Sequence, residues 1–500
     1  MSDLVKIRWR TPLPWILVAA GLMRVLSVMA AGGFRAVFLY DDGVYYSAAA
    51  GLANGVMPYR DFLLVHPPGS TLAYAPFASL GHVIPDSTAF AIARCEVIAI
   101  GVFNTWLVWR VAARVGKVAS VTAAGMYAVW FPVIFVERTT LLEPFVILGT
   151  LASLALMFAT KPKKWHPWVA GIVVGFGVAT KLWALVPFAV IVVAVLLAKR
   201  YRDALQYLVA GTMTGAIIVG PFFLVAPTAM YRMIITDQLG RAGPMGSPTR
   251  RFIELFNLRA LHLDPNIRVF DVPLLIALVL LVGIIGTIFA WRRYRQTRLW
   301  VILLGIQVSV LLWLPVYFTG YSSFAAPALV LSVGSIAQVA WSAEIPRVKP
   351  AVSRAALAVC AGVGAVSCGI YVAMNPHAFG PLSSTAVASV APGNCVASDR
   401  PATTIVANKL TSDLVHRCPV EFDVIGPFYE TNDFKVGTTS RRKSPSYQRY
   451  LQGYFAGNDY VIISRPAELS RSTRALLDAR PVVYRSHHGR VTIYGPPHPD

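Results

Sequence analysis

The sequence predicts a polytopic α-helical membrane protein of about 11 spans, followed by a small α/β unit. Hydrophobic residues make up 56% of the 500 residues and charged residues only 14%, whereas a soluble domain carries about 25% charged residues. Several apolar runs also approach the roughly 20 residues that one helix needs to cross the bilayer core. These observations predict that the protein is embedded in the lipid bilayer, which is thus one of its binding partners.

The formal net charge of +21 is distributed as membrane insertion requires. Short basic clusters alternate along the chain with loops in which the two signs balance, which is the pattern of the positive-inside rule. We therefore expect no nucleic-acid partner and place the basic clusters in the cytoplasm. They lie at 6–10, 110–117, 161–164, 199–202, 292–298 and 347–354.

This charge pattern predicts a cytoplasmic N-terminus and a membrane domain over residues 1–374. Residues 33–90 and 227–269 then form two long outer loops. The expected spans are 12–32, 91–113, 118–136, 143–160, 166–180, 182–198, 205–226, 270–290, 299–316, 322–341 and 353–373.

The stretch from Pro167 to Ala198 is too short for two full spans, because two spans need about 40 residues. A single span would place the basic clusters at its two ends on opposite sides of the membrane. We therefore predict two short helices that turn within the outer half of the membrane at Lys181. A lysine there would face a cavity and a partner; alternatively, its side chain would snorkel to the headgroups.

Residues 375–500 have the composition of a soluble unit, which we expect to be extracytoplasmic. Short β-type runs at NCVASD, EFDVIG and DYVIIS alternate with amphipathic helices, and a hairpin is expected in VVYRSHHGRVTIY. This pattern predicts a small mixed or parallel sheet. Cys395 and Cys418 both belong to this unit, and because an outer compartment permits disulfides, we expect them to pair.

The strongest sign of chemistry is the stretch DDGVYYSAAAGLANGVMPYRDFLLVHPPG in the first outer loop. Its acidic pair, Asp41 and Asp42, directly follows the first span, and Tyr45, Tyr46 and Asp61 lie nearby. One aspartate would serve as a helix cap, but two of them beside a tyrosine pair favour catalysis. A carboxylate at the membrane surface and next to a like charge is expected to bind a proton more readily, which suits a general base.

The HPPG sequence at the end of this stretch predicts a rigid corner. Pro67 and Pro68 fix φ, and Gly69 permits a sharp exit. A residue before proline is held extended, so His66 would project from a preset backbone. His66 would orient a carboxylate, bind phosphate or, together with Asp42, ligate a divalent cation; the sequence leaves the need for a cation open.

The acidic pair after the first span, followed by G…PY.DF and HPPG, resembles the first outer loop of the GT-C glycosyltransferases. That superfamily includes the protein O-mannosyltransferases and the aminoarabinose transferases. ERTTLLEPF, GFGVATKLWALVP and YFTGYSSFAAPAL resemble further motifs of the superfamily, so that the similarity covers residues 10–340. The C-terminal unit is loosely similar to the outer domains of actinobacterial envelope glycosyltransferases.

The resemblance implies transfer of a sugar, with inversion, from a polyprenyl monophosphate to an acceptor hydroxyl at the outer face of the plasma membrane. Asp41 would be the favoured base, and Asp42 would position the acceptor or a metal. Mannose is the favoured sugar and arabinofuranose is also compatible. The acceptor would be an envelope glycan, a glycolipid or a protein.

A phosphate leaving group needs cations and hydrogen-bond donors near it. Lys181 and the arginines of the second outer loop, Arg241 among them, are candidates, although a basic loop would also attract anionic headgroups. Glu143 precedes Pro144 and either supplies a second carboxylate or only begins a helix. Tyr321, in the late outer loop, completes the expected substrate-binding set.

Two other functions compete with glycosyl transfer. A transporter or flippase would commonly show inverted repeats and several charges within its spans, and the sequence shows no evident repeat and few such charges. A non-catalytic envelope-assembly protein would leave the polar density of the first outer loop unexplained.

Overall fold

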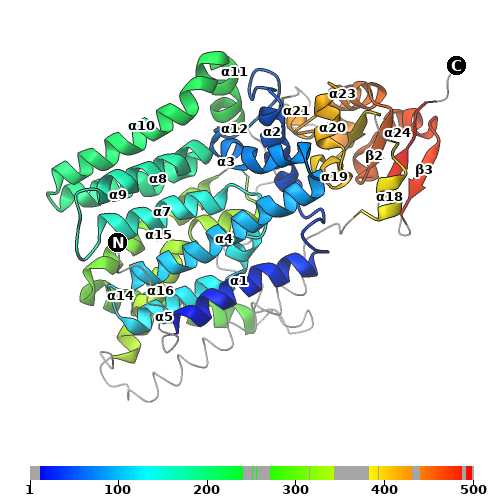
Figure 1. Ribbon diagram of the computed structural model, residues 1–500. Helices are drawn as coiled ribbons and strands as arrows, with labels where there is room; N and C mark the ends of the chain where they lie inside the picture. Colours follow the sequence, from blue (N-terminus) through cyan, green and yellow to red (C-terminus); the bar gives the residue numbers. More distant parts are fainter. Residues whose placement is uncertain are drawn as a thin grey trace.

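The computed structural model describes residues 12–239, 251, 255, 271–314, 316–342, 382–391, 394–430, 440–486 and 491–497. A bundle of apolar helices forms one body, and the C-terminal residues form a smaller mixed unit at one end of it (Figure 1). Within these described residues, the fold is that of a polytopic helical membrane protein with an attached α/β unit.

Four helices are long and apolar enough to cross a membrane, by length and composition among the described residues. They are α1 (Leu13–Ala30), α4 (Asp86–Ala112), α10 (Tyr201–Val225) and α15 (Arg295–Trp313). Further helices complete the bundle. These are α5 (Lys117–Val129), α6 (Phe131–Val136), α7 (Glu143–Met157), α8 (His166–Thr180), α9 (Leu185–Leu197), α14 (Asp271–Arg293) and α16 (Ala326–Trp341).

Each expected span up to residue 341 coincides with a described helix or helix pair, and the span expected at 353–373 lies outside the described residues. The predicted break at Lys181 is confirmed. Helix α8 ends at Thr180, a short 3-10 turn η2 (Leu182–Ala184) follows, and α9 begins at Leu185.

Within the described residues, the basic clusters at 110–117 and 199–202 both contact the end of α7. The guanidinium of Arg114, just after α4, donates to the carbonyls of Leu154 and Ala155 near the end of α7 at 2.8 and 2.6 Å. Arg200, between α9 and α10, donates to the carbonyl of Met157 at 2.6 Å. The ends that carry these arginines therefore lie together, as the positive-inside pattern predicts for a cytoplasmic face.

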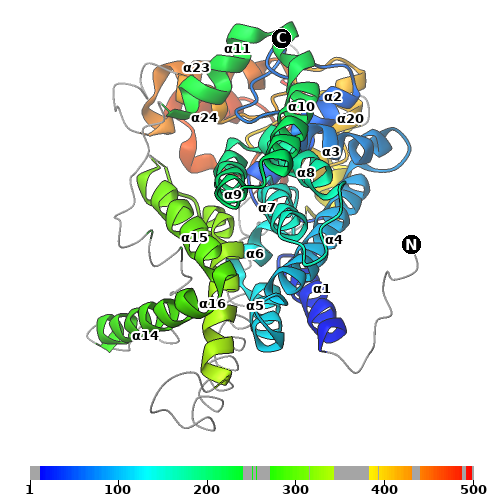
Figure 2. The same cartoon turned by 90° about the vertical axis from the view of Figure 1, so that its left-hand side faces the viewer.

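The opposite end carries the short helices of the outer loops, beside the C-terminal unit (Figure 2). From the first loop come α2 (Asp41–Ala53), α3 (Gly69–Ala78) and the 3-10 turn η1 (Ser79–His82). From the second come α11 (Pro227–Tyr231), the π-helical turn η3 (Arg232–Thr236) and α12 (Asp237–Leu239). The late loop contributes the 3-10 segment η5 (Thr319–Phe324).

A buried polar network ties the first helices of the bundle together. Arg24 of α1 forms an ion pair with Glu137, which follows α6, and neither side chain is exposed. The other oxygen of Glu137 accepts hydrogen bonds from Asn104 of α4 and Tyr127 of α5, each at 2.7 Å. A buried charge needs such pairing to avoid a large desolvation cost, so this carboxylate fixes how α1, α4 and α5 meet.

The C-terminal unit contains a four-stranded mixed sheet in the order β1-β2-β4-β3. The strands are β1 (Val396–Ser398), β2 (Tyr460–Ile463), β3 (Val482–Arg485) and β4 (Thr492–Tyr494). Strands β1 and β2 are parallel, and β4 runs antiparallel to both β2 and β3. The sheet therefore combines one parallel pair of strands, β1 and β2, with the expected hairpin, which β3 and β4 form.

The helices of this unit largely follow the sequence pattern. They are α18 (Ser384–Ala388), α19 (Pro401–Val406), α20 (Leu410–Val415), α21 (Gly426–Glu430), α23 (Pro445–Ala456) and α24 (Arg471–Asp478), with 3-10 turns η6 (Arg441–Lys443) and η7 (Pro466–Glu468). The strand predicted at EFDVIG is wrong, because this apolar run packs as an irregular segment before α21. Its residue Phe422 stacks on Phe62 of the first outer loop, with ring centroids 4.3 Å apart.

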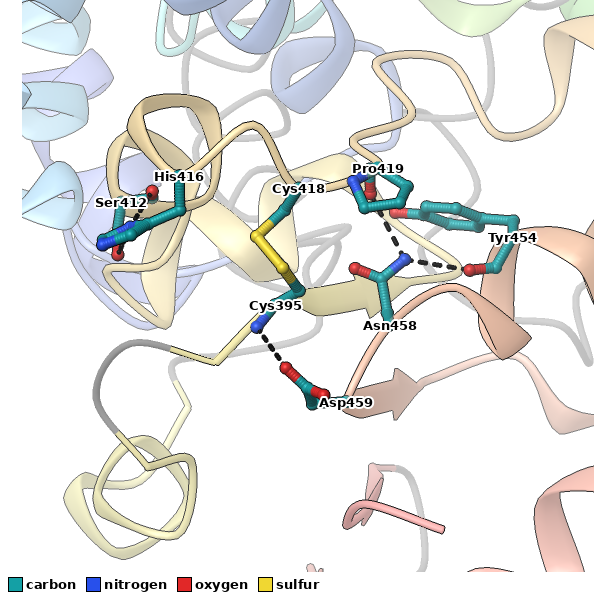
Figure 3. The surroundings of a disulfide bond; sticks show 8 residues. All are labelled: Cys395, Ser412, His416, Cys418, Pro419, Tyr454, Asn458 and Asp459. Carbon is teal, nitrogen blue, oxygen red and sulfur yellow. Dashed lines mark hydrogen bonds between the residues drawn. A yellow bond between two sulfur atoms is a disulfide. The ribbon is translucent and has the colours of Figure 1, made fainter.

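Cys395 and Cys418 form a disulfide that joins the residue before β1 to the segment that follows α20 (Figure 3). The backbone N–H of Cys395 also donates to Asp459 at 2.9 Å, and the amide of Asn458 donates to the carbonyl of Pro419 at 3.3 Å. These contacts fasten α20 to the parallel pair of strands.

Candidate functional site

The two aspartates of the acidic pair have opposite environments at the start of α2. Asp41 is exposed, whereas the side chain of Asp42 is completely buried. Both lie in the first turn of the helix, where the positive end of the helix dipole stabilises a carboxylate. Only the first of them can meet a substrate from solvent.

Asp42 is held from the membrane side. One carboxylate oxygen accepts from Arg94 of α4 at 3.0 Å and from the hydroxyl of Thr139 at 2.8 Å. The other accepts from the backbone N–H of Gly43 at 2.8 Å, and the Asp42 carbonyl accepts from Thr140 at 3.0 Å. These contacts argue against Asp42 as a base or metal ligand, and they make it an anchor for the start of α2.

Tyr45, a buried residue of α2, connects this helix to the HPPG corner. It lies four residues after Asp41, so the two share one face of the helix. The ring of Tyr45 meets the imidazole of His66 edge to face, with centroids 5.8 Å apart. The hydroxyl of Tyr59 donates to the His66 carbonyl at 2.7 Å. His66 therefore has contacts at both its ring and its backbone, and the ring contact is with a residue one helical turn from Asp41.

Gly69, at the end of the corner, packs directly on the end of α8. A Cβ at this position would overlap the carbonyl of Ala179 and the hydroxyl of Thr180. Only glycine permits this approach, and it brings the corner against the two residues that precede Lys181.

Lys181 lies in a cage of aromatic rings and one carboxylate. Its ammonium donates to Glu143, at the start of α7, with Nζ and Oε1 2.6 Å apart. The same nitrogen lies 4.0 Å from the ring centroid of Trp183 and 4.6 Å from that of Tyr321. Lys181 is only 3% exposed, so the expected partner for a buried lysine is present and snorkelling is excluded. Three of the predicted residues thus converge from three separate loops.

Arg251 adds a second cation beside this cage. It is 3% exposed, its guanidinium lies 5.8 Å from the ring of Tyr317, and it donates to the carbonyl of Leu312 at 3.0 Å. Arg241, the arginine singled out from the sequence, lies outside the described residues.

Two other predicted residues have structural contacts. Tyr46 is 1% exposed and packs on Phe90, with ring centroids 4.8 Å apart. Asp61 accepts from the backbone N–H of Met57 at 2.8 Å and pairs with Arg60 at 2.7 Å. The side chain of Arg60, followed by the backbone N–H of Met57, holds the pKa of Asp61 below its usual range. Tyr46 therefore packs inside the protein, and Asp61 holds a local turn of the loop.

A metal centre is not evident in the part of the chain that the structure describes. There, no group of three or more His, Cys, Asp and Glu side chains gathers as a cation requires. The contacts of Asp42 further argue against its pairing with His66 around a cation.

Sequence reasoning missed the residues that hold the site from below. Arg94, Thr139 and Thr140 all lie in apolar surroundings, and Tyr59 adopts a left-handed backbone with φ of 68°. The available signals were a polar side chain within an apolar segment, for Arg94, and the ERTTLLEPF motif, for the two threonines; neither identifies the partner.

The fold is similar to those of several solved membrane proteins. The crystal structure of ArnT from Cupriavidus metallidurans in the apo state is similar with a TM-score of 0.61 at 14% identity, over 96% of this chain and 97% of that chain. ArnT bound to undecaprenyl phosphate gives a TM-score of 0.53 at 14% identity, over 96% and 98%. The archaeal oligosaccharyltransferase AglB from Archaeoglobus fulgidus, in complex with an inhibitory peptide and a dolichol-phosphate, gives 0.53 at 12% identity, over 98% and 75%.

The family model of glycosyltransferase family 87 matches residues 62–315, which is more than half of the chain. The chain therefore belongs to glycosyltransferase family 87. No curated protein matches it significantly.

Proposed function

We propose that this glycosyltransferase moves a sugar, mannose before arabinofuranose, from a polyprenyl monophosphate to a hydroxyl of a cell-envelope acceptor, with inversion and with Asp41 as the base. The observation that supports this proposal is that the start of α2, the HPPG corner and the Lys181 cage adjoin one another: Tyr45 of α2 contacts His66, and Gly69 packs against the two residues that precede Lys181. A base and a phosphate-binding cation then lie at the two ends of one site.

The Lys181 cage suits the donor phosphate. In the displacement, the acceptor oxygen bonds to the anomeric carbon while the bond from that carbon to the phosphate oxygen breaks, so negative charge gathers on the phosphate. A cation with aromatic walls stabilises that charge strongly because the surroundings exclude water. Lys181 supplies the charge, Arg251 lies near it, and Glu143 keeps Lys181 in place before the donor binds.

Asp41 suits the acceptor hydroxyl. Its exposure at the end of α2 allows a hydroxyl to approach, and the proton released by that hydroxyl passes to the carboxylate. General-base assistance contributes about 10²- to 10⁴-fold to such steps. Asp42 serves this role indirectly, because its bonds to Arg94 and Thr139 hold the first turn of α2.

The orientation is part of the proposal. The arginines that face the opposite end of the bundle favour a cytoplasmic location for that end, and the disulfide favours an oxidising compartment for the C-terminal unit. We therefore propose a plasma-membrane enzyme with a cytoplasmic N-terminus, a membrane domain over 1–374 and an extracytoplasmic unit over 375–500.

The test uses the full chain in lipid nanodiscs, with radiolabelled polyprenyl-phosphate mannose or arabinofuranose as donor. Membranes from a strain that lacks this protein supply the acceptor. Asp41→Asn is expected to lower transfer by about 10²- to 10⁴-fold at unchanged donor binding.

Asp203→Asn is the matched control, because this carboxylate pairs with Arg200 at the opposite end of the bundle. Its transfer rate should equal that of the wild type. Undiminished transfer by Asp41→Asn would remove the base assignment, and the absence of transfer by the wild type from both donors would remove the proposed donor class.

A further inference from the structure

We propose that the C-terminal unit positions the catalytic base, and that Tyr40 and Asp423 are the positioning pair through which it does so. This inference rests on the proposed role of Asp41. It gives the C-terminal unit a direct part in the transfer step, through a contact that neither half of the chain can make alone.

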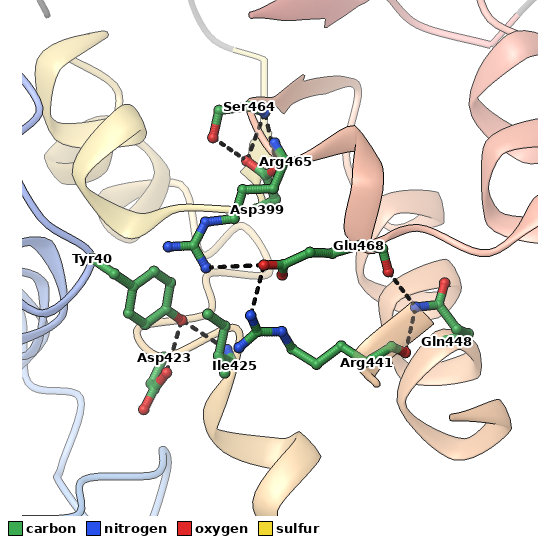
Figure 4. Close-up of polar contacts among 9 residues, drawn as sticks. All are labelled: Tyr40, Asp399, Asp423, Ile425, Arg441, Gln448, Ser464, Arg465 and Glu468. Carbon is green, nitrogen blue, oxygen red and sulfur yellow. Dashed lines mark hydrogen bonds and ion pairs between the residues drawn. The ribbon is translucent and has the colours of Figure 1, made fainter. Parts of the chain in front are cut away.

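Tyr40 is the residue immediately before Asp41 and forms the N-cap of α2. Its hydroxyl donates to the carboxylate of Asp423 at 2.8 Å and accepts from the backbone N–H of Ile425 at 2.7 Å (Figure 4). The guanidinium of Arg465, from the end of β2, lies 4.9 Å from the centroid of the Tyr40 ring. The side chain of the residue that begins the base helix is thus bound within the C-terminal unit.

The Tyr40 hydroxyl remains protonated and can therefore always donate its hydrogen bond to Asp423. Burial, followed by the charge of Asp423, raises the pKa of the Tyr40 hydroxyl well above its ordinary value. Asp423 is itself fixed, because it accepts from the backbone N–H of Gly426 at 2.9 Å at the start of α21. The Tyr40 hydroxyl therefore keeps its proton and its partner throughout the ordinary pH range.

A second contact fixes the same turn of α2. A Cβ at Gly43 would overlap the backbone and side chain of Ala402 in α19. Since α2 and α19 meet without an intervening side chain, small movements of the C-terminal unit pass directly to the first turn of α2. On its other side, the same turn is fixed by the hydrogen bonds that Arg94 and Thr139 donate to Asp42. Asp41 therefore lies between two sets of contacts, one from the C-terminal unit and one from the membrane bundle.

A base must lie within hydrogen-bond reach of the hydroxyl that it deprotonates, and a misplacement of about 1 Å can cost on the order of 10²-fold in rate. Loss of the Tyr40 contact is therefore expected to act on the turnover number. Donor affinity should be unchanged, because the Lys181 cage contacts neither Tyr40 nor Asp423 in the described bonds.

The experiment compares Tyr40→Phe, Asp423→Asn and the double variant in nanodiscs, with the labelled donor and acceptor membranes described above. Tyr40→Phe is expected to lower kcat by about 10- to 100-fold, with the Kd for unlabelled polyprenyl phosphate unchanged. The double variant should lose no more than Tyr40→Phe, because residues that act as one unit are not additive.

Two matched controls separate positioning from general stability. Tyr207→Phe removes another buried tyrosine hydroxyl bond, to Ser153 at 3.1 Å, within the membrane bundle, and it should leave kcat unchanged. Gly43→Ala should reproduce the loss of kcat by a different contact. Gly453→Ala, with nothing within 4 Å of the added Cβ, should not.

Wild-type kcat in Tyr40→Phe, or additive losses in the double variant, would overturn the inference. If Tyr40→Phe does not accumulate in membranes, Gly43→Ala decides alone, and wild-type kcat there overturns it. If Asp41→Asn is inactive while the Tyr40 and Gly43 variants are fully active, the proposed function stands and only the positioning role fails.

Discussion

Lys181 and Glu143 form a buried ion pair at the end of the bundle that carries the outer loops, with Nζ and Oε1 2.6 Å apart and the lysine lying against Trp183 and Tyr321. The pair joins the break between α8 and α9 to the start of α7. Under the proposed function, the donor phosphate would compete with the Glu143 carboxylate for this ammonium.

Lys181→Gln should weaken the binding of polyprenyl phosphate by about 10- to 100-fold, because a hydrogen bond to a charged group contributes about 1.5–3 kcal/mol. Glu143→Gln keeps the ammonium and should retain phosphate binding while it lowers thermal stability. Ligand binding in nanodiscs measures the first effect. Lys164→Gln, an exposed lysine at the basic end, is the control; equal affinities for all three variants would contradict a donor role for Lys181.

Glu137→Gln should destabilise the membrane bundle by about 3–5 kcal/mol, since it leaves Arg24 buried without its charged partner. Thermal unfolding in detergent measures this change. Adding Arg24→Met to Glu137→Gln, which keeps an oxygen that accepts from Asn104 and Tyr127, should recover much of the loss, because no buried charge then lacks its partner. A single variant as stable as the wild type would show that Glu137 does not hold the helices together.

Asp413 should make the C-terminal unit less stable as the pH rises. Burial raises the pKa of this carboxyl to about 8, so the folded chain holds the proton over a range in which the unfolded chain has lost it. The resulting stabilisation is complete below a pH of about 4 and is lost as the pH rises to about 8, because stability falls wherever the folded state binds more protons.

Unfolding of the full chain, followed at several pH values, tests this dependence. Asp413→Asn cannot titrate and should be more stable than the wild type at pH values above about 8, with a flatter pH profile. Parallel profiles for the two proteins would show that another group is responsible.

Removal of the disulfide should lower the stability of the C-terminal unit by about 3 kcal/mol, as expected for closure of a loop of this length. The bond spans a sequence separation of 23. The variant Cys395→Ala with Cys418→Ala should unfold at the same temperature as the reduced wild type. Cys95→Ala is the control, because Cys95 is a free thiol in α4.

The sequence by itself determined the class of fold and the general location of the site. Placing a charge in lipid is unfavourable, and each residue contributes to this free energy individually. Apolar segments and alternating basic clusters can therefore be read from the local sequence. For that reason the helices and the break at Lys181 could be predicted. The strand expected at EFDVIG was wrong, because a short apolar run packs equally well without strand partners.

Only the tertiary structure decided which members of the candidate set act together. Asp41 and Asp42 are neighbours with the same side chain, yet the fold exposes one and pairs the other with Arg94, which lies 52 positions away. Glu143, Lys181 and Tyr321 likewise meet through contacts between distant segments. Burial and pairing are properties of such long-range contacts, and local sequence patterns do not carry them.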